Sequence, residues 1–394
     1  MRVAGIALGL IFLFACWGGP PQLRAADEAN KNKKSDAPQA EQKDDAKSGE
    51  AEQEEADPYQ LPEKATVKQL LDFMKSVQAR RTQIKTQAEA IAFQTRGQAA
   101  LRVAGEKIEQ IATDDDKKLP GYTDAVAFNL VLRASASRDN SPGEVKELAA
   151  DIKNAIVANE AAPPQQPFFM FSATKFLLAA ATQLGVMLEY NRHPELHDLA
   201  AEVYRELGTP LAASKDAEAA KTGEKMIGAA RRLDLPGKPF ELTGTEMDGS
   251  KFDWAKYRGK VVLVDFWATW CRPCLIALPD LKRSYQLFHD LGFEVVGISM
   301  DRDRNALEQF MARENFPWVI LSDGDFDANP LATQYGIFGI PNVILVDKEG
   351  KVVSTAAQGP ELDRLLTKLL GEPKPPETEK PDSDAPKDQS GAGK

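Results

Sequence analysis

Two cysteines three positions apart, Cys271 and Cys274, are the residues of this sequence best suited to chemistry. They lie in residues 261–279 (VVLVDFWATWCRPCLIALP), where a β-branched apolar run is followed by aromatic residues, the cysteines and a segment with helical spacing. This pattern predicts a strand, a tight turn and a helix. Cys271 is expected at the turn and Cys274 one turn inside the helix.

A helix N-terminus is an environment that activates a cysteine. Unsatisfied backbone N–H groups and the positive end of the peptide dipoles lower a cysteine pKa from about 8.5 into a range of roughly 3.5 to 7.5. Cys271 is therefore the expected nucleophile, and Cys274 is close enough to resolve a mixed disulfide. Pro273 suits the first helical turn, where no N–H is needed, and Arg272 adds a positive charge that favours the thiolate.

The sequence resembles the thioredoxin superfamily, and within it the exported TlpA and ResA-like thiol-disulfide oxidoreductases. The resemblance rests on FWATWCRPC, on Pro279 and on the later GIFGIPNVILVDKEGKVV, and it covers residues 233–371. It implies an α/β thioredoxin fold, with a central mixed sheet flanked by helices. It also implies a redox-active Cys271–Cys274 disulfide that exchanges with the cysteines of substrate proteins.

The same resemblance implies a substrate-binding turn. Ile340 and Pro341 would form the cis-proline turn of the family, facing the disulfide and presenting backbone to an extended substrate. Trp270, directly before Cys271, would also contact the substrate.

One position departs from the family pattern. The TlpA and ResA-like proteins usually carry a glutamate three residues after the second cysteine, where this chain has Ala277. Asp265 stands in an otherwise apolar strand six residues before Cys271, where desolvation would raise its pKa. We hypothesise that Asp265 replaces the glutamate as proton acceptor for Cys274. The alternative is a strand-end aspartate bound to backbone or water.

The family resemblance implies a reductant fed by a membrane electron donor of the DsbD or CcdA type, without a cofactor. Two other functions remain open. One is an interaction protein in which a helical domain binds the partner. The other is a peroxiredoxin-like thiol peroxidase, although its pattern needs threonine three residues before the attacking cysteine, where Ala268 stands here. The sequence does not set the redox direction.

The first 25 residues read as a signal peptide, because Arg2 precedes an apolar run too short for a membrane span. Cys16 would be lipidated if the signal is of the lipoprotein type, whereas a conventional signal would end at Ala25 or Ala26. Either reading predicts export to the periplasm or cell envelope, with a membrane anchor in the first case. Residues 26–58 form a polar, acidic linker without the apolar content to fold.

Residues 59–232 show apolar spacing of three and four without strand alternation, which predicts a separate all-α domain. Helical runs are expected around residues 67–91, 101–111, 125–136, 144–159, 168–190, 194–207 and 211–232, and Ser141 before Pro142 is an expected N-cap. Residues 372–394, rich in proline and charge, form a disordered tail.

The net charge of −10 argues against a nucleic-acid partner. No metal site is expected, because one CxxC supplies two of the four ligands that a structural zinc needs. His193 and His197 are four positions apart, but no third ligand of matching spacing stands near them.

Overall fold

The computed structural model describes residues 6–7, 57–82, 86–162, 166–169 and 171–373. The expected signal segment with Cys16, apart from residues 6–7, nearly all of the acidic linker and the tail from residue 374 lie outside the described residues. The chain divides into two compact units, one up to Ala220 and one from Lys221 onward.

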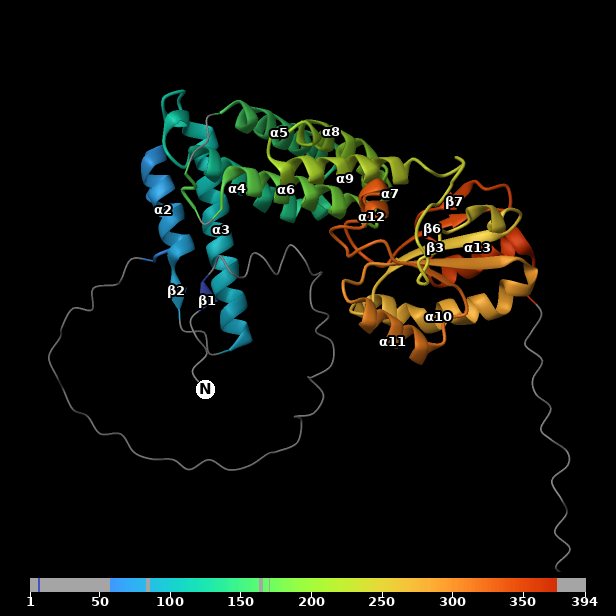
Figure 1. Ribbon diagram of the computed structural model, residues 1–394. Coiled ribbons are helices and arrows are strands. Elements are labelled where there is room, and N and C mark those ends of the chain that lie inside the picture. The colour runs from blue at the N-terminus through green and yellow to red at the C-terminus, as the bar shows by residue number, and fades with distance from the viewer. Residues whose placement is uncertain (1–5, 8–56, 83–85, 163–165, 170, 374–394) are drawn as a thin grey trace, which may run out of the picture. The chain divides into compact units, whose positions relative to one another are not determined.

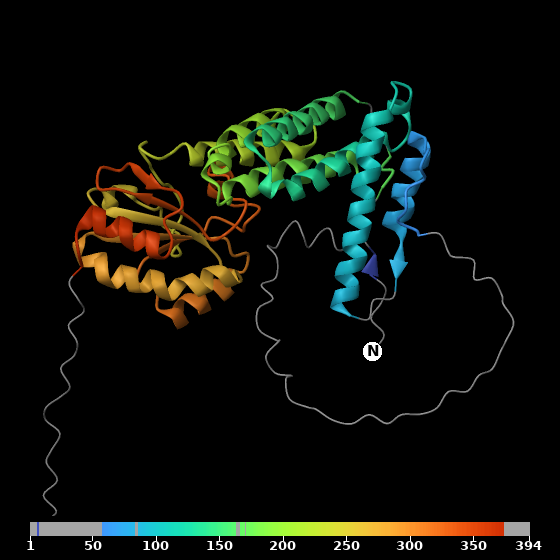
Figure 2. The ribbon, with the colours of Figure 1, turned by 180° about the vertical axis from the view of Figure 1, so that it is seen from behind.

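The first unit is helical, as the sequence predicts (Figure 1; Figure 2 shows it from behind). Its helices are α2 (Val67–Ala79), α3 (Gln87–Ile111), α4 (Tyr122–Ala136), α5 (Pro142–Ala161), α6 (Ala173–Glu189), α7 (Pro194–His197) and α8 (Ala200–Ala212), with 3₁₀ turns η1 (Asp116–Lys118) and η2 (Ser137–Asp139) and a short pair β1 (Ile6–Ala7) and β2 (Arg81–Thr82). Ser141 caps α5 in a capping box with Glu144.

Several helical stretches differ from expectation. The stretches expected over residues 67–91 and 101–111 are instead α2, which ends at Ala79, and α3, which begins at Gln87, and the stretch expected from residue 211 begins at Ala217. Two further differences have a visible cause or contact. The run expected from residue 168 begins at Ala173, because the Asp124 carboxylate accepts the N–H groups of Phe168 at 2.6 Å and Ala173 at 2.7 Å and holds the intervening chain against α4. The run expected over residues 194–207 is two helices, α7 and α8. The Nδ1 atom of His197 lies 2.8 Å from the Glu189 carbonyl oxygen, which joins the end of α7 to α6.

Helix α9 (Ala217–Leu233) crosses the division between the units. The sequence placed the boundary at residues 232/233, whereas the structure divides the chain at 220/221. The reason lies in the packing of the helix from Lys221 onward. The Arg232 side chain is buried and donates from Nε to the Tyr335 carbonyl oxygen at 2.9 Å, so this part of α9 belongs to the second unit.

The second unit is built on a five-stranded mixed sheet in the order β5-β4-β3-β6-β7. Its elements are η3 (Trp254–Tyr257), β3 (Val261–Trp267), α10 (Arg272–Phe288), η4 (His289–Leu291), β4 (Phe293–Ser299), α11 (Arg304–Glu314), β5 (Val319–Leu321), α12 (Pro330–Gln334), β6 (Asn342–Val346), β7 (Val352–Ser354) and α13 (Pro360–Leu370). Strands β3, β4 and β5 are parallel, and β6 and β7 are antiparallel. This confirms the expected α/β architecture.

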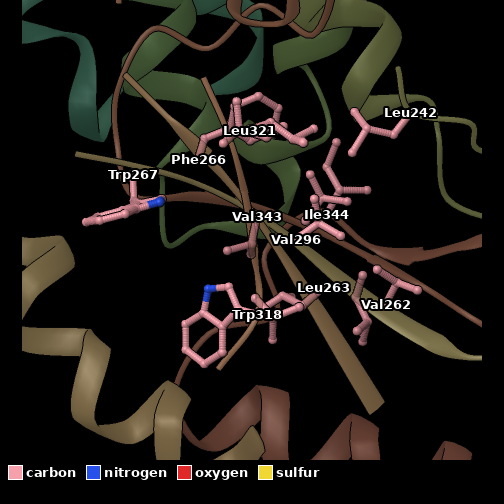
Figure 3. Close-up of a cluster of buried hydrophobic side chains, with 14 of the residues drawn as sticks. Leu242, Val262, Leu263, Phe266, Trp267, Val296, Trp318, Leu321, Val343 and Ile344 are labelled. Carbon is pink, nitrogen blue, oxygen red and sulfur yellow. The ribbon is translucent and has the colours of Figure 1, made fainter. Parts of the chain in front are cut away.

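The central strand β3 carries the chain into the cysteine pair. Its apolar residues are buried on both faces, as Figure 3 shows for Phe266 on one side of the sheet and Leu263 on the other. Helix α10 is tied to α13 by Ser284, which donates to Asp363 at 2.6 Å. It is tied to α11 by Lys282, which donates to the Glu314 carbonyl oxygen at 2.5 Å. These bonds fix the second half of α10 relative to the two neighbouring helices.

The segment before β3 contains a turn at Asp248-Gly249, a residue pair typical of a two-stranded hairpin. In the structure only Thr245 and Lys251 form a bridge across it. Glu246 pairs with Leu321 at the β5 edge, and Pro239 pairs with Lys351 beside β7. The segment therefore divides its pairing between the two sheet edges instead of forming two strands of its own.

Candidate active site

Cys271 is the N-cap residue of α10, and Cys274 lies in its first turn. The two form a disulfide, with Pro273 in the first turn as expected, and both are at least 93% buried. The Cys274 N–H points at the Cys271 sulfur at 3.2 Å. The helix N-terminus is therefore directed at Cys271, where it would stabilise a thiolate.

The turn before β6 faces this pair. The Ile340–Pro341 peptide bond is cis, and the carbonyl oxygen of Ile340 lies 3.6 Å from the Cys271 sulfur. Pro341 lines a cavity together with Cys274. The structure thus brings together both cysteines and both residues of the turn named from the sequence.

Asp265 lies in the middle of β3, opposite Gly297 of β4 and Val343 of β6. Its side chain lines the same cavity as Cys274, on the face of the sheet covered by α10. Burial raises the pKa of its carboxyl from 3.8 to about 7. Such a group takes up and releases a proton near neutral pH, which general base chemistry requires.

The cavity beneath the disulfide has a volume of about 70 Å³, enough for several water molecules. Ala277 lines it from the exposed side of α10, at the position where the family usually has glutamate. A small side chain there leaves the space open. Water therefore has room beside Asp265, which keeps partial solvent access.

Trp270 is 57% exposed beside the disulfide, and its ring lies 6.4 Å from that of Phe326 in an edge-on arrangement. Ile276, on the second turn of α10, is 69% exposed. Sequence reasoning missed Ile276. The available signal was an apolar residue two positions after Cys274, where helical spacing does not require a core residue. The exposed side chains of Trp270 and Ile276 add apolar surface at the turn before α10 and on its second turn.

Asp301 was also missed. It lies two residues after the end of β4 and is 6% exposed. Its carboxylate accepts the Thr269 N–H at 3.1 Å, the Thr269 hydroxyl at 2.5 Å and the Ser299 hydroxyl at 2.9 Å. These bonds hold the turn that presents Trp270 and Cys271. An aspartate two residues after the end of a buried strand was the signal that could have pointed to it.

Within the described part of the chain, no group of three or more His, Cys, Asp or Glu side chains is arranged to hold a metal ion. Among those same residues, no helix combines the length and the apolar character needed to cross a membrane.

Comparison with known proteins gives consistent results. The Redoxin family model matches residues 234–367. The thiol-disulfide oxidoreductase ResA of Bacillus thuringiensis subsp. konkukian is 30% identical over 124 residues, which are 31% of this chain and 69% of that protein. ResA of Bacillus subtilis is 29% identical over 147 residues, 37% of this chain and 76% of the relative.

Among solved structures, the thioredoxin domain of a thiol-disulfide oxidoreductase from Bacteroides vulgatus is similar, with 31% identity and a TM-score of 0.32. The similarity covers 34% of this chain and 97% of that one.

Proposed function

This chain belongs to the ResA family of thiol-disulfide oxidoreductases, and we propose that it exchanges a Cys271–Cys274 dithiol or disulfide with cysteines of substrate proteins, acting as a reductant. The observation that carries the proposal is the placement of the cysteine pair. Cys271 caps a helix and lies 3.6 Å from the carbonyl oxygen of Ile340 in the cis-proline turn. A substrate segment that pairs with this turn would bring its own sulfur to Cys271.

The reduced enzyme starts the reaction with Cys271 as thiolate. Its sulfur attacks one sulfur of a substrate disulfide, so that a mixed disulfide forms and the first substrate thiolate leaves and is protonated. Cys274 then attacks the Cys271 sulfur. The Cys271–Cys274 bond forms, the second substrate thiolate leaves, and two electrons have passed from the enzyme to the substrate.

Asp265 is the proposed base for the second step. Cys274 is a poor nucleophile while it carries its proton, and it lines the same cavity as the Asp265 carboxyl. A pKa of about 7 lets Asp265 accept that proton at neutral pH. Waters with room in the cavity would carry the proton between the two groups and on to solvent past Ala277.

The electrostatic surroundings support the reducing direction. The buried Asp301 carboxylate binds Thr269, whose Cα lies at most about 7 Å along the chain from that of Cys271. A negative charge there opposes a thiolate and so destabilises the dithiol relative to the disulfide. Arg272 acts in the opposite sense, but it is exposed and largely screened.

The proposal includes export, with cysteine-containing proteins of the periplasm or cell envelope as substrates. A membrane dithiol donor of the DsbD or CcdA type would return the Cys271–Cys274 disulfide to the dithiol. Lipidation of Cys16 would attach the chain to a membrane, whereas cleavage after Ala25 or Ala26 would release it. Residue 16 lies outside the described residues, so the two alternatives for the signal segment are inferred from the sequence.

The test is the equilibrium redox potential of the pair in the full chain, by thiol trapping in glutathione and dithiothreitol buffers, with Cys271→Ser as control. We expect a value near thioredoxin's about −270 mV. A value near about −120 mV would overturn the reducing direction, and failure to form a reversible disulfide would overturn the exchange itself. Catalytic consumption of hydrogen peroxide would instead indicate a thiol peroxidase.

A further inference from the structure

Helix α9 from Lys221 onward lies outside the matched family region, which begins at residue 234, yet it packs on the segment that leads to the cis-proline turn. Figure 1 shows α9 beside α12. Gly228 abuts the backbone of Thr333 and Gln334, where a β carbon would overlap their carbonyl oxygens. Together with the bond from Arg232 to Tyr335, this fixes the chain five residues before Ile340.

Lys225 extends from this helix to the aromatic residues near the disulfide. Its Nζ atom lies 4.4 Å from the ring centre of Phe326 and 5.2 Å from that of Phe338. The Phe326 ring contacts the ring of Trp270, which precedes Cys271, and Phe338 stands three residues before Pro341. Lys225 therefore borders the surface that a substrate would cover.

The Lys225 ammonium group has lost much of its hydration without gaining an ion pair. Burial is the main cause that lowers its pKa to about 8, and Lys221 lowers it further, while Asp327 raises it. Over the residues that the structure describes, no carboxylate oxygen comes within 4.0 Å of its nitrogen. The two aromatic rings offset only part of the desolvation of a cation.

A carboxylate brought by a bound substrate would supply the missing partner. Trp270, which contacts Phe326, is an exposed apolar side chain and suits contact with a polypeptide segment rather than with a small anion. Because the site is partly desolvated, an ion pair formed there would be stronger than one on an open surface.

We propose that Lys225 is a specificity-determining residue, which selects cysteine-bearing segments that carry an aspartate or glutamate close to the reactive cysteine. This inference rests on the proposed disulfide exchange. It assigns to a helix outside the family region a part in choosing the substrate of the redox domain.

The test uses the reduced full chain and a set of synthetic disulfide-bonded peptides, identical except for one residue near the cysteine, which is Glu, Gln or Lys. Rates are followed by tryptophan fluorescence under single-turnover conditions. We expect the second-order rate constant for the Glu peptide to exceed that for the Gln peptide about fivefold, the size of one ion pair at a partly exposed site, with the difference in the apparent dissociation constant of the peptide and not in the saturating rate. Added salt should reduce the ratio.

Lys225→Met keeps the length and apolar stem of the side chain and should bring the ratio to about one, whereas Lys225→Arg should retain it. Lys221→Met is the matched control, since Lys221 is an exposed lysine one turn earlier on the same helix, and it should leave the ratio unchanged. A ratio near one in the unmodified chain, or a ratio unaffected by Lys225→Met, would overturn the inference.

The small neutral disulfide 2-hydroxyethyl disulfide separates the two proposals. If the unmodified chain reduces it but shows no preference among the peptides, only the role of Lys225 fails. If the chain reduces neither it nor any peptide, the proposed exchange fails.

Discussion

The sulfur of Cys271 lies 3.6 Å from the carbonyl oxygen of Ile340, although the two residues are 69 positions apart in the chain. One belongs to the N-terminus of α10 and the other to the turn before β6. The reactive sulfur and a backbone acceptor for an extended substrate thus occupy the same few ångströms. Predictions for five variants, each with its measurement, follow from this arrangement and from the residues that support it.

Substitution of each cysteine should separate the two steps of exchange. Cys271→Ser is expected to abolish reduction of a substrate disulfide, because it is Cys271 that caps α10 and lies 3.6 Å from the Ile340 carbonyl oxygen, where a substrate would pair. Cys274→Ser is expected to accumulate the mixed disulfide at Cys271, because the resolving thiol is missing. Non-reducing electrophoresis and mass spectrometry measure both outcomes. An adduct in Cys271→Ser and none in Cys274→Ser would reverse the assigned roles.

Asp265→Asn should remove the pH dependence of mixed-disulfide resolution. In the unmodified chain, the resolution rate is expected to rise with pH up to about 7, as Asp265 loses its proton, and then to level off. Asparagine cannot accept the proton, so this inflection should vanish and the rate at pH 7 should fall about 10²-fold or more. Asp280→Asn, an exposed carboxyl on the same cavity, is the control. An inflection retained in Asp265→Asn would exclude the base role.

The same substitution should change stability. The Asp265 pKa is about 7 in the folded chain and 3.8 when unfolded, so between about pH 4 and 7 the unfolded state releases a proton that the folded state keeps. The free energy of unfolding should therefore fall as pH rises through that window. Asp265→Asn should remove this slope and gain up to about 4 kcal/mol at pH 7.

Urea unfolding followed by tryptophan fluorescence measures this effect. Four of the five tryptophans, Trp254, Trp267, Trp270 and Trp318, lie in the second unit, so the signal reports on the redox domain. A stability that is independent of pH between 4 and 7 in the unmodified chain would contradict the raised pKa.

Asp301→Asn should make the disulfide easier to reduce. The substitution removes a buried negative charge near Cys271 and so favours the thiolate. We expect the potential to rise by about 10–30 mV, equivalent to about 0.5–1.4 kcal/mol, with a loss of about 1–3 kcal/mol in stability as the bonds to Thr269 weaken. Asp290→Asn changes the net charge equally at the far end of α10 and should leave the potential unchanged. A fall in potential in Asp301→Asn would refute the electrostatic argument.

Gly336→Ala should disturb the cis-proline turn through α9. Gly336 has a φ of +59°, and a β carbon there would overlap the backbone of Ala229 in α9. Gly350→Ala is the matched control, because its φ is +79° but nothing lies within 4 Å of the added carbon. Both should lose about 1–2 kcal/mol from the left-handed backbone. Gly336→Ala should lose stability beyond this backbone cost and should slow the exchange with peptide substrates, whereas Gly350→Ala should do neither. Equal effects of the two variants would argue against coupling between α9 and the cis-proline turn.

The sequence alone determined the features that depend on residues close to one another along the chain. The strand, turn and helix around Cys271 and Cys274 follow from apolar periodicity and from a proline in the first turn, and Ser141 caps α5 because its own side chain reaches the third residue of the helix. The cis bond at Ile340–Pro341 could be expected only from the family resemblance, because spacing does not distinguish it from a trans bond.

Tertiary packing alone decided which distant residues meet. Asp301 binds Thr269 across 32 positions, and Arg232 binds Tyr335 across 103. The periodic spacing over residues 211–232 predicted a helix, but an amphipathic helix shows only that one face is buried and not which core covers it. The second part of α9 therefore joined the redox domain rather than the helical one, because Gly228 and Gly336 let the two backbones approach more closely than side chains would allow.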